Sequence, residues 1–321
     1  MEIIRRLPVP TGDIVVVRGE RGMLEFVSLG DYGKDVNIKC DALGLSRVPS
    51  PVRHTTMMPL TKKWVVTIST QYGCSMRCIF CDVPKVGPGK NASGVDMLGQ
   101  IWTAIRLHPT VSRTDRLNIH FARMGEPTFN YDVLAVGRAI KLMLEPDYTV
   151  HPVVSTMMPR LNTDLFWFLK GWMDIKNYVY GGEAGLQLSI NSTNDGERDA
   201  MFDGSSASLS SIGKLVARLP SPRGRKITLN FAVAGYEING TKLRNWFDPA
   251  RCICKLTPMH KTAAAIEHGI QTGGDYTEYH PYQQAEESLK AAGFDVLVFI
   301  ASKEEDESRI TCGNAVLAEG K

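Results

Sequence analysis

Hydrophobic and polar residues follow two different patterns along this chain. In the first 60 residues, two runs of β-type composition, DIVVVR (13–18) and MLEFVSL (23–29), are bounded by Gly and Asp turns. The stretch SRVPSPVR (46–53) is rich in Pro and Ser and predicts a linker. We therefore expect a small β-rich extension over residues 1–60, followed by a larger domain over residues 61–321.

From residue 61 onward, apolar runs of strand length alternate with segments of helical period. Such alternation predicts βα units around a parallel sheet, and six or seven units would form a partial or full barrel. We expect an α/β fold of the partial (β/α)6 type, similar to a TIM barrel, with its chemistry at the C-terminal ends of the strands. The predicted strands are 64–69, 117–122, 153–156, 186–191, 227–233, 252–257 and 295–300, and the predicted helices are 95–107, 131–145, 162–171, 208–219, 241–247 and 282–293.

Composition limits the functional classes. Hydrophobic residues make up 43% of 321 residues, which is enough for a sizeable core. The formal net charge is only +3, so any nucleic-acid contact must come from a local basic patch. We find neither the roughly 18 consecutive apolar residues of a spanning helix nor a signal peptide, and we expect a cytoplasmic protein with no membrane contact.

Three of the seven cysteines lie close together. Cys74, Cys78 and Cys81 follow the first predicted barrel strand with C-x3-C-x2-C spacing. Three thiolates on one loop can hold three irons of a [4Fe–4S] cubane and leave the fourth iron open for a ligand. The alternative is a zinc site, which usually has four ligands, the fourth being Cys252, Cys254 or a histidine.

The chain resembles the radical S-adenosylmethionine (SAM) superfamily in this motif, and the RlmN/Cfr family of RNA adenine methyltransferases in the order of its segments. The resemblance runs over roughly 61–321 and implies a radical SAM partial barrel that holds a [4Fe–4S] cluster and SAM. The segments that carry it are STQYGC (69–74), RMGEPTFNYD (123–132), VVSTMMPRL (153–161), LSINSTNDGERD (188–199), CKLTPMH (254–260) and ITCGNAV (310–316).

The resemblance implies a set of SAM-contacting residues at strand ends. Gly125 would let the amino-acid part of SAM approach the backbone, and the Glu126 carboxylate would accept from its ammonium. The ordinary alternative for a strand-end Ser or Asn is a turn-forming role. The remaining expected SAM contacts are Ser155, Ser189, Asn191 and His260.

Cys312 matches the family's methyl-carrying cysteine. The resemblance implies that it takes a methyl group from one SAM, and that a 5′-deoxyadenosyl radical from a second SAM abstracts hydrogen from the S-methyl group. The resulting carbon radical adds to an sp2 carbon of the substrate, which is a poor target for a methyl cation. The alternative is a buried cysteine that acts as a small hydrophobic residue.

The chain departs from the family pattern at several positions. A second cysteine, which resolves the protein–RNA crosslink in the family, is replaced by Thr67, and a hydroxyl cannot form that disulfide. Cys40 lies in the extension. Cys252 and Cys254 share one predicted strand, and we expect only one of them to face inward. The family's histidine and asparagine at two strand ends are Asn191 and His260 here.

Glu25 resembles a family glutamate that handles substrate protons, although an exposed strand residue is the simpler interpretation. The family's N-terminal helical RNA-contact domain has no counterpart in these residues, which favours a diverged substrate. Local basic groups that could meet RNA phosphates are Lys62 and Lys63; Arg223, Arg225 and Lys226; and Arg251, Lys255 and Lys261.

The leading hypothesis is a radical SAM methyltransferase that uses Cys312 to methylate an sp2 carbon of an RNA or smaller adenine-like substrate. The first alternative is a non-methylating radical SAM enzyme that applies the deoxyadenosyl radical directly to a small molecule. The second is a metal-binding or RNA-binding protein with a decayed site. The expected electron donor is a low-potential flavodoxin or ferredoxin, and we expect a monomer.

Overall fold

The computed structural model describes residues 1–31, 57–270, 280–299 and 315–317. Cys40, Cys312 and the predicted linker at 46–53 lie outside the described residues.

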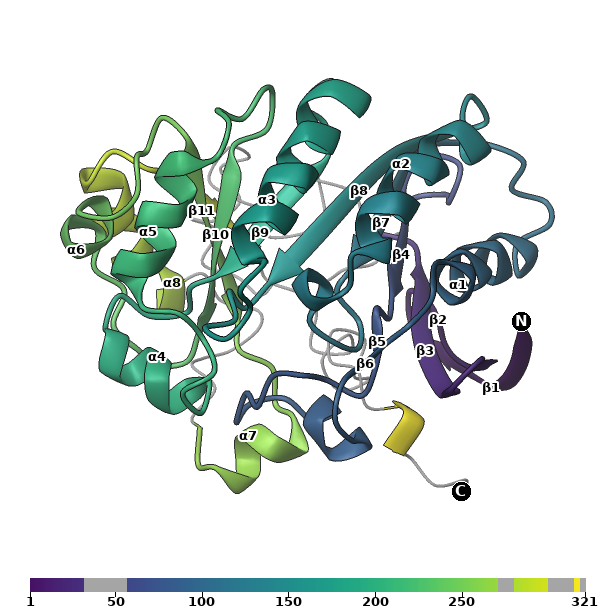
Figure 1. The fold of residues 1–321 in the computed structure, drawn as a ribbon, viewed down its shortest axis with the longest axis horizontal. Helices are drawn as coiled ribbons and strands as arrows, with labels where there is room; N and C mark the ends of the chain where they lie inside the picture. The colour runs from purple at the N-terminus through teal and green to yellow at the C-terminus, as the bar shows by residue number, and fades with distance from the viewer. Residues whose placement is uncertain (32–56, 271–279, 300–314, 318–321) are drawn as a thin grey trace.

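One ten-stranded sheet organises the described part of the chain (Figure 1). Seven strands run parallel and neighbour one another in chain order, and the sheet does not close within the described residues. This confirms the expected α/β partial barrel. The parallel strands are β4 (Trp64–Ile68), β7 (Thr114–Phe121), β8 (Tyr148–Thr156), β9 (Gly185–Ser189), β10 (Ile227–Val233), β11 (Cys252–Pro258) and β12 (Asp295–Val298).

The N-terminal strands extend this sheet rather than forming a separate layer. Three antiparallel strands follow one another here: β1 (Glu2–Val9), β2 (Gly12–Gly19) and β3 (Gly22–Leu29). Each pairs with the next, and β3 pairs antiparallel with β4. Thr67 of β4 therefore lies between Val27 of β3 and His120 of β7. The N-terminal strands therefore border the parallel part of the sheet on the side of β4.

Helices cover the outer face of the sheet, as α2 and α3 do over β7 and β8 (Figure 1). Between these layers lies the main core, in which the rings of Phe121 and Trp172 meet edge to face at 5.8 Å. None of the helices in the described ranges is long and apolar enough to cross a membrane. The helices are α1 (Gly94–Arg106), α2 (Asp132–Leu144), α3 (Leu165–Asp174), α4 (Asp195–Met201), α5 (Leu209–Arg218), α6 (Gly240–Arg244), α7 (Ala263–Glu267) and α8 (His280–Ala291).

Several short elements lie between the longer strands and helices. In the described residues they are β5 (Gln71–Tyr72), β6 (Lys90–Asn91) and four turns of 3-10 or π helix. The 3-10 turns are Val83–Val86, Pro127–Phe129 and Ala315–Leu317, and the π turn is Ile175–Val179.

The strict alternation along β10 and β11 separates two faces of the sheet. On β10, Leu229 and Phe231 are buried under the helices, whereas Thr228 and Asn230 are half-buried on the opposite face. On β11, Lys255 and Thr257 take the corresponding half-buried positions. The period of two predicted from the sequence thus gives the barrel an apolar outer face and a polar inner face.

Candidate active site

The three cysteines of the motif lie on one loop that starts at the end of β5. Gly73 adopts φ +72°, and a Cβ on it would meet the Gly87 carbonyl oxygen at 2.2 Å, so the chain folds tightly onto the returning segment. The amide of Cys74 donates to that same oxygen at 3.2 Å, and the amide of Cys81 donates to the Cys78 carbonyl at 3.2 Å. Backbone contacts therefore hold the loop, and the Met76 amide adds a hydrogen bond to the Cys74 sulfur at 3.4 Å.

The three thiols influence one another electrostatically. Burial raises the pKa of Cys78 well above its usual value, and the nearby Cys81 and Cys74 add to that rise. Burial likewise raises the pKa of Cys81 to about 12, again with a contribution from Cys74. In the described residues no three His, Cys, Asp or Glu side chains converge as ligands of one ion. The donor set is three soft thiols on one loop, and it is their chemistry that matches the ligands of an iron–sulfur cluster.

Gly125 is required for a reason that the sequence did not reveal. It adopts φ +94°, and a Cβ there would meet the Cβ of Gln71 at 2.4 Å and the backbone nitrogen of Gln71 at 2.8 Å. Gln71 in turn accepts from the amides of Glu126 and Ser75. The glycine turn thus packs directly against the start of the cysteine loop.

The Glu126 carboxylate follows this turn and is 1% exposed. One oxygen accepts from the amide and hydroxyl of Thr128, and the other accepts from the Met157 amide at 2.8 Å. Burial raises its pKa, although these donors oppose the rise. Burial, with a smaller contribution from the charge of Glu126, raises the pKa of Cys74 to about 11. A carboxylate and the thiol loop therefore lie close together.

The ends of β8 and β9 present the other residues expected to contact SAM. Ser155 and Ser189 are half-buried on the inner face of the sheet. Asn191 adopts φ +61°, a left-handed conformation that asparagine tolerates, and its side-chain oxygen accepts from the Ala232 amide. In this structure Asn191 ties the end of β9 to β10, which is the turn-forming role of the ordinary alternative.

His260 follows β11 and is half-buried. Its carbonyl accepts from the Thr262 amide, and the Thr262 hydroxyl donates to the Phe80 carbonyl within the cysteine loop at 2.7 Å. Asp82, which is 2% exposed, accepts from the Ala264 amide at the start of α7. The segment after β11 is therefore joined to the cysteine loop, as the predicted site requires.

The prediction that one of Cys252 and Cys254 faces inward is wrong. Both side chains are fully buried in the core between the sheet and the helices. Residues two apart on a strand share a face, so the two thiols point the same way, away from the barrel interior.

The interpretation of Glu25 as an exposed strand residue is also wrong. Its side chain is 0% exposed and forms an ion pair with Arg123, from Oε1 to Nε, at 2.7 Å. Its second oxygen accepts from the Val316 amide at 2.9 Å. Arg123 lies directly before the Met124-Gly125-Glu126 turn, and it opposes the rise in the pKa of Cys81. Glu25 thus lies beside the candidate site and is linked to it through Arg123.

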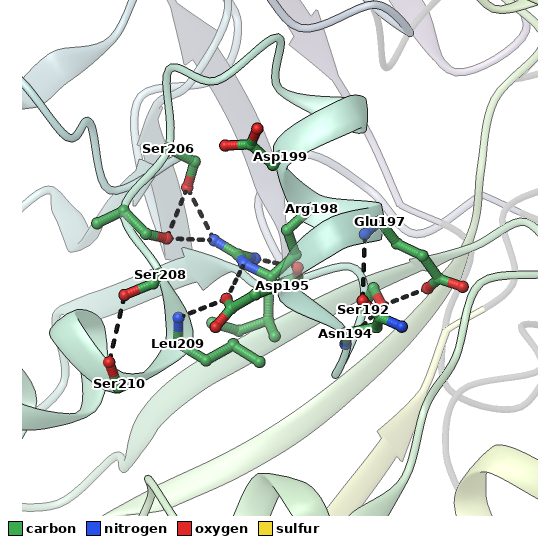
Figure 2. A network of polar contacts seen from close by, with 12 residues as sticks. Ser192, Asn194, Asp195, Glu197, Arg198, Asp199, Ser206, Ser208, Leu209 and Ser210 are labelled. Carbon is green, nitrogen blue, oxygen red and sulfur yellow. Dashed lines mark hydrogen bonds and ion pairs between the residues drawn. The ribbon is translucent and has the colours of Figure 1, made fainter.

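Sequence reasoning missed Arg198, whose side chain is only 2% exposed (Figure 2). It lies in α4, and its guanidinium donates to carbonyls at the end of β9 and to Ser206. A short polar helix such as Asp195–Met201 has no hydrophobic period, so the N-cap residue Asn194 is the only sequence signal for it.

Comparisons with known proteins support the resemblance to the RlmN/Cfr family. No family model matches the chain. It is 30% identical over 148 residues to the dual-specificity RNA methyltransferase RlmN of Pseudomonas entomophila, which covers 39% of this chain and 38% of that protein. It is 28% identical over 149 residues to RlmN of Marinobacter nauticus, covering 39% and 40%. The chain thus aligns with about two fifths of the length of these curated relatives.

The structural comparison establishes the fold. A crystal structure of a radical SAM methyltransferase from Sphaerobacter thermophilus matches 95% of this chain and 79% of that chain, with a TM-score of 0.65 and 18% sequence identity. The chain therefore has the same partial-barrel fold as that structure, as the order of its βα units predicted.

Proposed function

We propose that this protein is a radical SAM methyltransferase of the RlmN/Cfr type, with a [4Fe–4S] cluster on Cys74, Cys78 and Cys81. The observation that carries the proposal is the position of Glu126 beside the thiols. The three cysteines lie on one loop, and the Glu126 carboxylate raises the pKa of two of them. A cluster and a cationic cofactor would relieve this crowding of negative charge, because thiolates bind iron and a carboxylate binds an ammonium.

The chain's own residues would hold SAM at the ends of consecutive strands. Glu126 would accept from its ammonium while Met157 and Thr128 keep the carboxylate in place. Ser155, Ser189, Asn191 and His260 would bind its remaining polar groups. When bound, the cluster would supply the electron that cleaves SAM. A low-potential flavodoxin or ferredoxin would deliver that electron.

Cys312 would carry the methyl group as a thioether, as its place in ITCGNAV suggests. The described residues that follow it support a position near the site. Val316 donates to Glu25, and the 3-10 turn Ala315–Leu317 packs on β2 and β3. Cys312 is four positions before Val316, which is at most about 14 Å of extended chain.

The substrate would be anionic, such as a nucleotide of RNA. Burial and the charges of Lys255, Arg225, Lys63 and Arg116 lower the pKa of the His120 imidazole to about 3. His120 is therefore neutral, and the positive charges around it would attract the phosphate groups of such a substrate. Cytoplasmic location and a monomeric state are part of this proposal.

One observation favours a second candidate, a non-methylating radical SAM enzyme. Thr67 lies half-buried at the position of the family's resolving cysteine, and it cannot form a disulfide. Cys252 and Cys254 cannot replace it, because both are enclosed in the outer core. In a methyltransferase, Cys40 would be the remaining thiol for the resolving step. Otherwise the reaction would have to end without a disulfide.

The test is an anaerobic purification, reconstitution with iron and sulfide, and incubation with SAM and dithionite, followed by mass spectrometry of the Cys312 peptide and the small molecules. A methylated Cys312 together with 5′-deoxyadenosine supports the methyltransferase. Deoxyadenosine without methylated Cys312 supports the second candidate. A protein with the C78S substitution that still assembles the cluster and cleaves SAM would sink both, whereas C252S serves as the matched control.

A further inference from the structure

Arg198 occupies a position that few arginines take. Its side chain is 2% exposed, yet the nearest carboxylate oxygen, on Asp195, lies 3.9 Å from its Nε. That Nε makes no hydrogen bond. Asp195 itself is half exposed and accepts from the Leu209 amide at 2.7 Å. A buried guanidinium with so weak an ion pair is costly, so its stabilising contacts must be sought elsewhere.

Those contacts are the carbonyl groups at the end of β9 and the loop that follows α4. Nη1 donates to the Ile190 carbonyl and, at 3.3 Å, to the Ser189 carbonyl. Nη2 donates to the Ser206 hydroxyl at 2.8 Å and to the Ala207 carbonyl at 3.2 Å (Figure 2). The rigid planar fork of arginine holds two separate segments at a fixed spacing.

Ser206 passes the connection on to β8. Its hydroxyl donates to the Met157 carbonyl at 2.7 Å, directly after the end of that strand. The Met157 amide donates to the Glu126 carboxylate at 2.8 Å. An unbroken chain of hydrogen bonds therefore runs from Glu126 through Met157, Ser206 and Arg198 to Ser189. It joins the C-terminal ends of β7, β8 and β9.

We propose that Arg198 is a positioning residue for the SAM site, which sets the spacing between the ends of β8 and β9 and the direction of the Glu126 carboxylate. The proposal rests on the proposed function, since Glu126 and Ser189, at the two ends of this chain of hydrogen bonds, are expected SAM contacts. Arg198 would touch neither SAM nor the cluster. It would act through Ser206 and Met157 on one side and through the β9 carbonyls on the other.

A structural role alone would give a different result. If Arg198 only stabilised the fold, its loss would lower the melting temperature and leave the affinity of the folded protein for SAM unchanged. A displaced Glu126 would instead weaken SAM binding and raise KM for SAM more than it lowers kcat. The affinity of the folded protein therefore separates the two roles.

The chain offers a matched control in Arg160, which lines the same cavity of about 220 Å³ next to Arg198. Its Nε donates to the Ser206 carbonyl at 3.2 Å, and its Nη2 donates to Asp199 at 2.7 Å, but its side chain is half exposed. Arg160 contacts the Ser206 carbonyl and Asp199, but neither the Ser206 hydroxyl that bonds Met157 nor the carbonyls at the end of β9. The substitution R160M thus removes a guanidinium from the same cavity and leaves the connection between the strands intact.

The experiment compares wild type with the variants R198M, R198K, S206A and R160M, all as the full chain. Binding of S-adenosylhomocysteine to the cluster-free protein, binding of SAM to the reconstituted protein and the melting temperature are measured for each. We expect R198M to lose at least tenfold in affinity for both ligands, R198K to recover part of the loss, and R160M to stay within twofold of wild type. S206A keeps Arg198 but cuts the link to Met157, and it should lose affinity in the same direction.

Equal affinities for wild type, R198M and S206A would overturn the inference while leaving the proposed function standing. If R198M does not fold, S206A alone decides the question. If wild type itself binds neither SAM nor S-adenosylhomocysteine, the proposed function fails, and the inference fails with it. A double variant, R198M/S206A, should lose no more affinity than R198M, because both changes cut one chain of contacts.

Discussion

Glu25 and Arg123 form a fully buried ion pair, with 2.7 Å between Oε1 and Nε, although 98 residues separate them in the chain. The pair joins the N-terminal hairpin to the turn that carries Gly125 and Glu126. The same carboxylate receives the Val316 amide, so a single side chain links three distant parts of the sequence.

The substitution E25Q should destabilise the protein by about 3–5 kcal/mol, because it removes the negative charge beside a buried guanidinium. Urea unfolding followed by circular dichroism measures the change. The matched control is E2Q, which breaks the exposed pair between Glu2 and Arg18 and should cost less than about 1 kcal/mol. Similar losses for the two variants would contradict this account of the buried pair.

The substitution E126Q should weaken SAM binding about 10-fold to 150-fold, the range expected when a charge-assisted hydrogen bond of about 1.5–3 kcal/mol is lost. Equilibrium dialysis with the reconstituted protein measures the affinity. Glu197 of α4 supplies the control, since its carboxylate accepts from the Ser192 hydroxyl and the Glu237 amide in the neighbouring loops. Unchanged affinity in E126Q, or an equal loss in E197Q, would remove Glu126 from the site.

The two thiols of β11 should make the protein less stable at alkaline pH. Burial raises the pKa of Cys252 to about 12 and shifts that of Cys254 upward as well. An unfolded thiol ionises near pH 8.5, so above that value the unfolded state has lost protons that the folded state retains. The stability that these thiols contribute is thus complete below about pH 8.5 and is lost as the pH rises toward 12.

The variant C252A should therefore show a shallower loss of stability above pH 8.5, by up to about 1.4 kcal/mol per pH unit. Urea unfolding between pH 7.5 and 10 gives the slope for both proteins. The comparison is a difference in slopes, which cancels the contribution of the other buried groups. Parallel curves would mean that Cys252 ionises as readily in the folded state as in the unfolded state.

If the methyltransferase proposal is correct, Cys40 should be the resolving thiol. The C40S variant should accumulate a covalent adduct between protein and substrate, and the T67C substitution in that background should release it, because it restores a thiol at the family position. Denaturing electrophoresis and intact-protein mass spectrometry detect the adduct. Wild-type turnover by C40S would show that the reaction ends without this thiol.

The periodic parts of the sequence predicted the barrel well. The strand predicted at 227–233 coincides with β10, and the helices at 95–107 and 131–145 differ from α1 and α2 by one residue at each end. The helix expected at 162–171 spans Leu165–Asp174 instead, because Asn162 forms a local turn by accepting from the Asp164 amide. Asn and Asp before an apolar run thus marked the region of the helix start but not its first residue.

Elements without an apolar period were missed. The strand β1, EIIRRLPV, is largely exposed at the edge of the sheet and contains a proline. Its sequence has no alternation of apolar and polar residues, and it has no buried face, so nothing in the sequence predicted it. The five-residue helix α7 is too short to show a period. The burial of Glu25 was invisible for another reason. Its partners lie at positions 123 and 316, and no local pattern reports a contact over such a distance.

The position of Glu25 has a consequence for how the protein matures as it is made. Its last partner, Val316, leaves the ribosome 291 residues after Glu25 does. At about 5–20 residues per second, synthesis of that stretch takes about 15–60 s. Throughout this interval the hairpin of β2 and β3 can form, but the carboxylate between them and Arg123 lacks one of its donors. The set of donors around this buried carboxylate is thus completed only after residue 316 has been made, later in synthesis than every described strand.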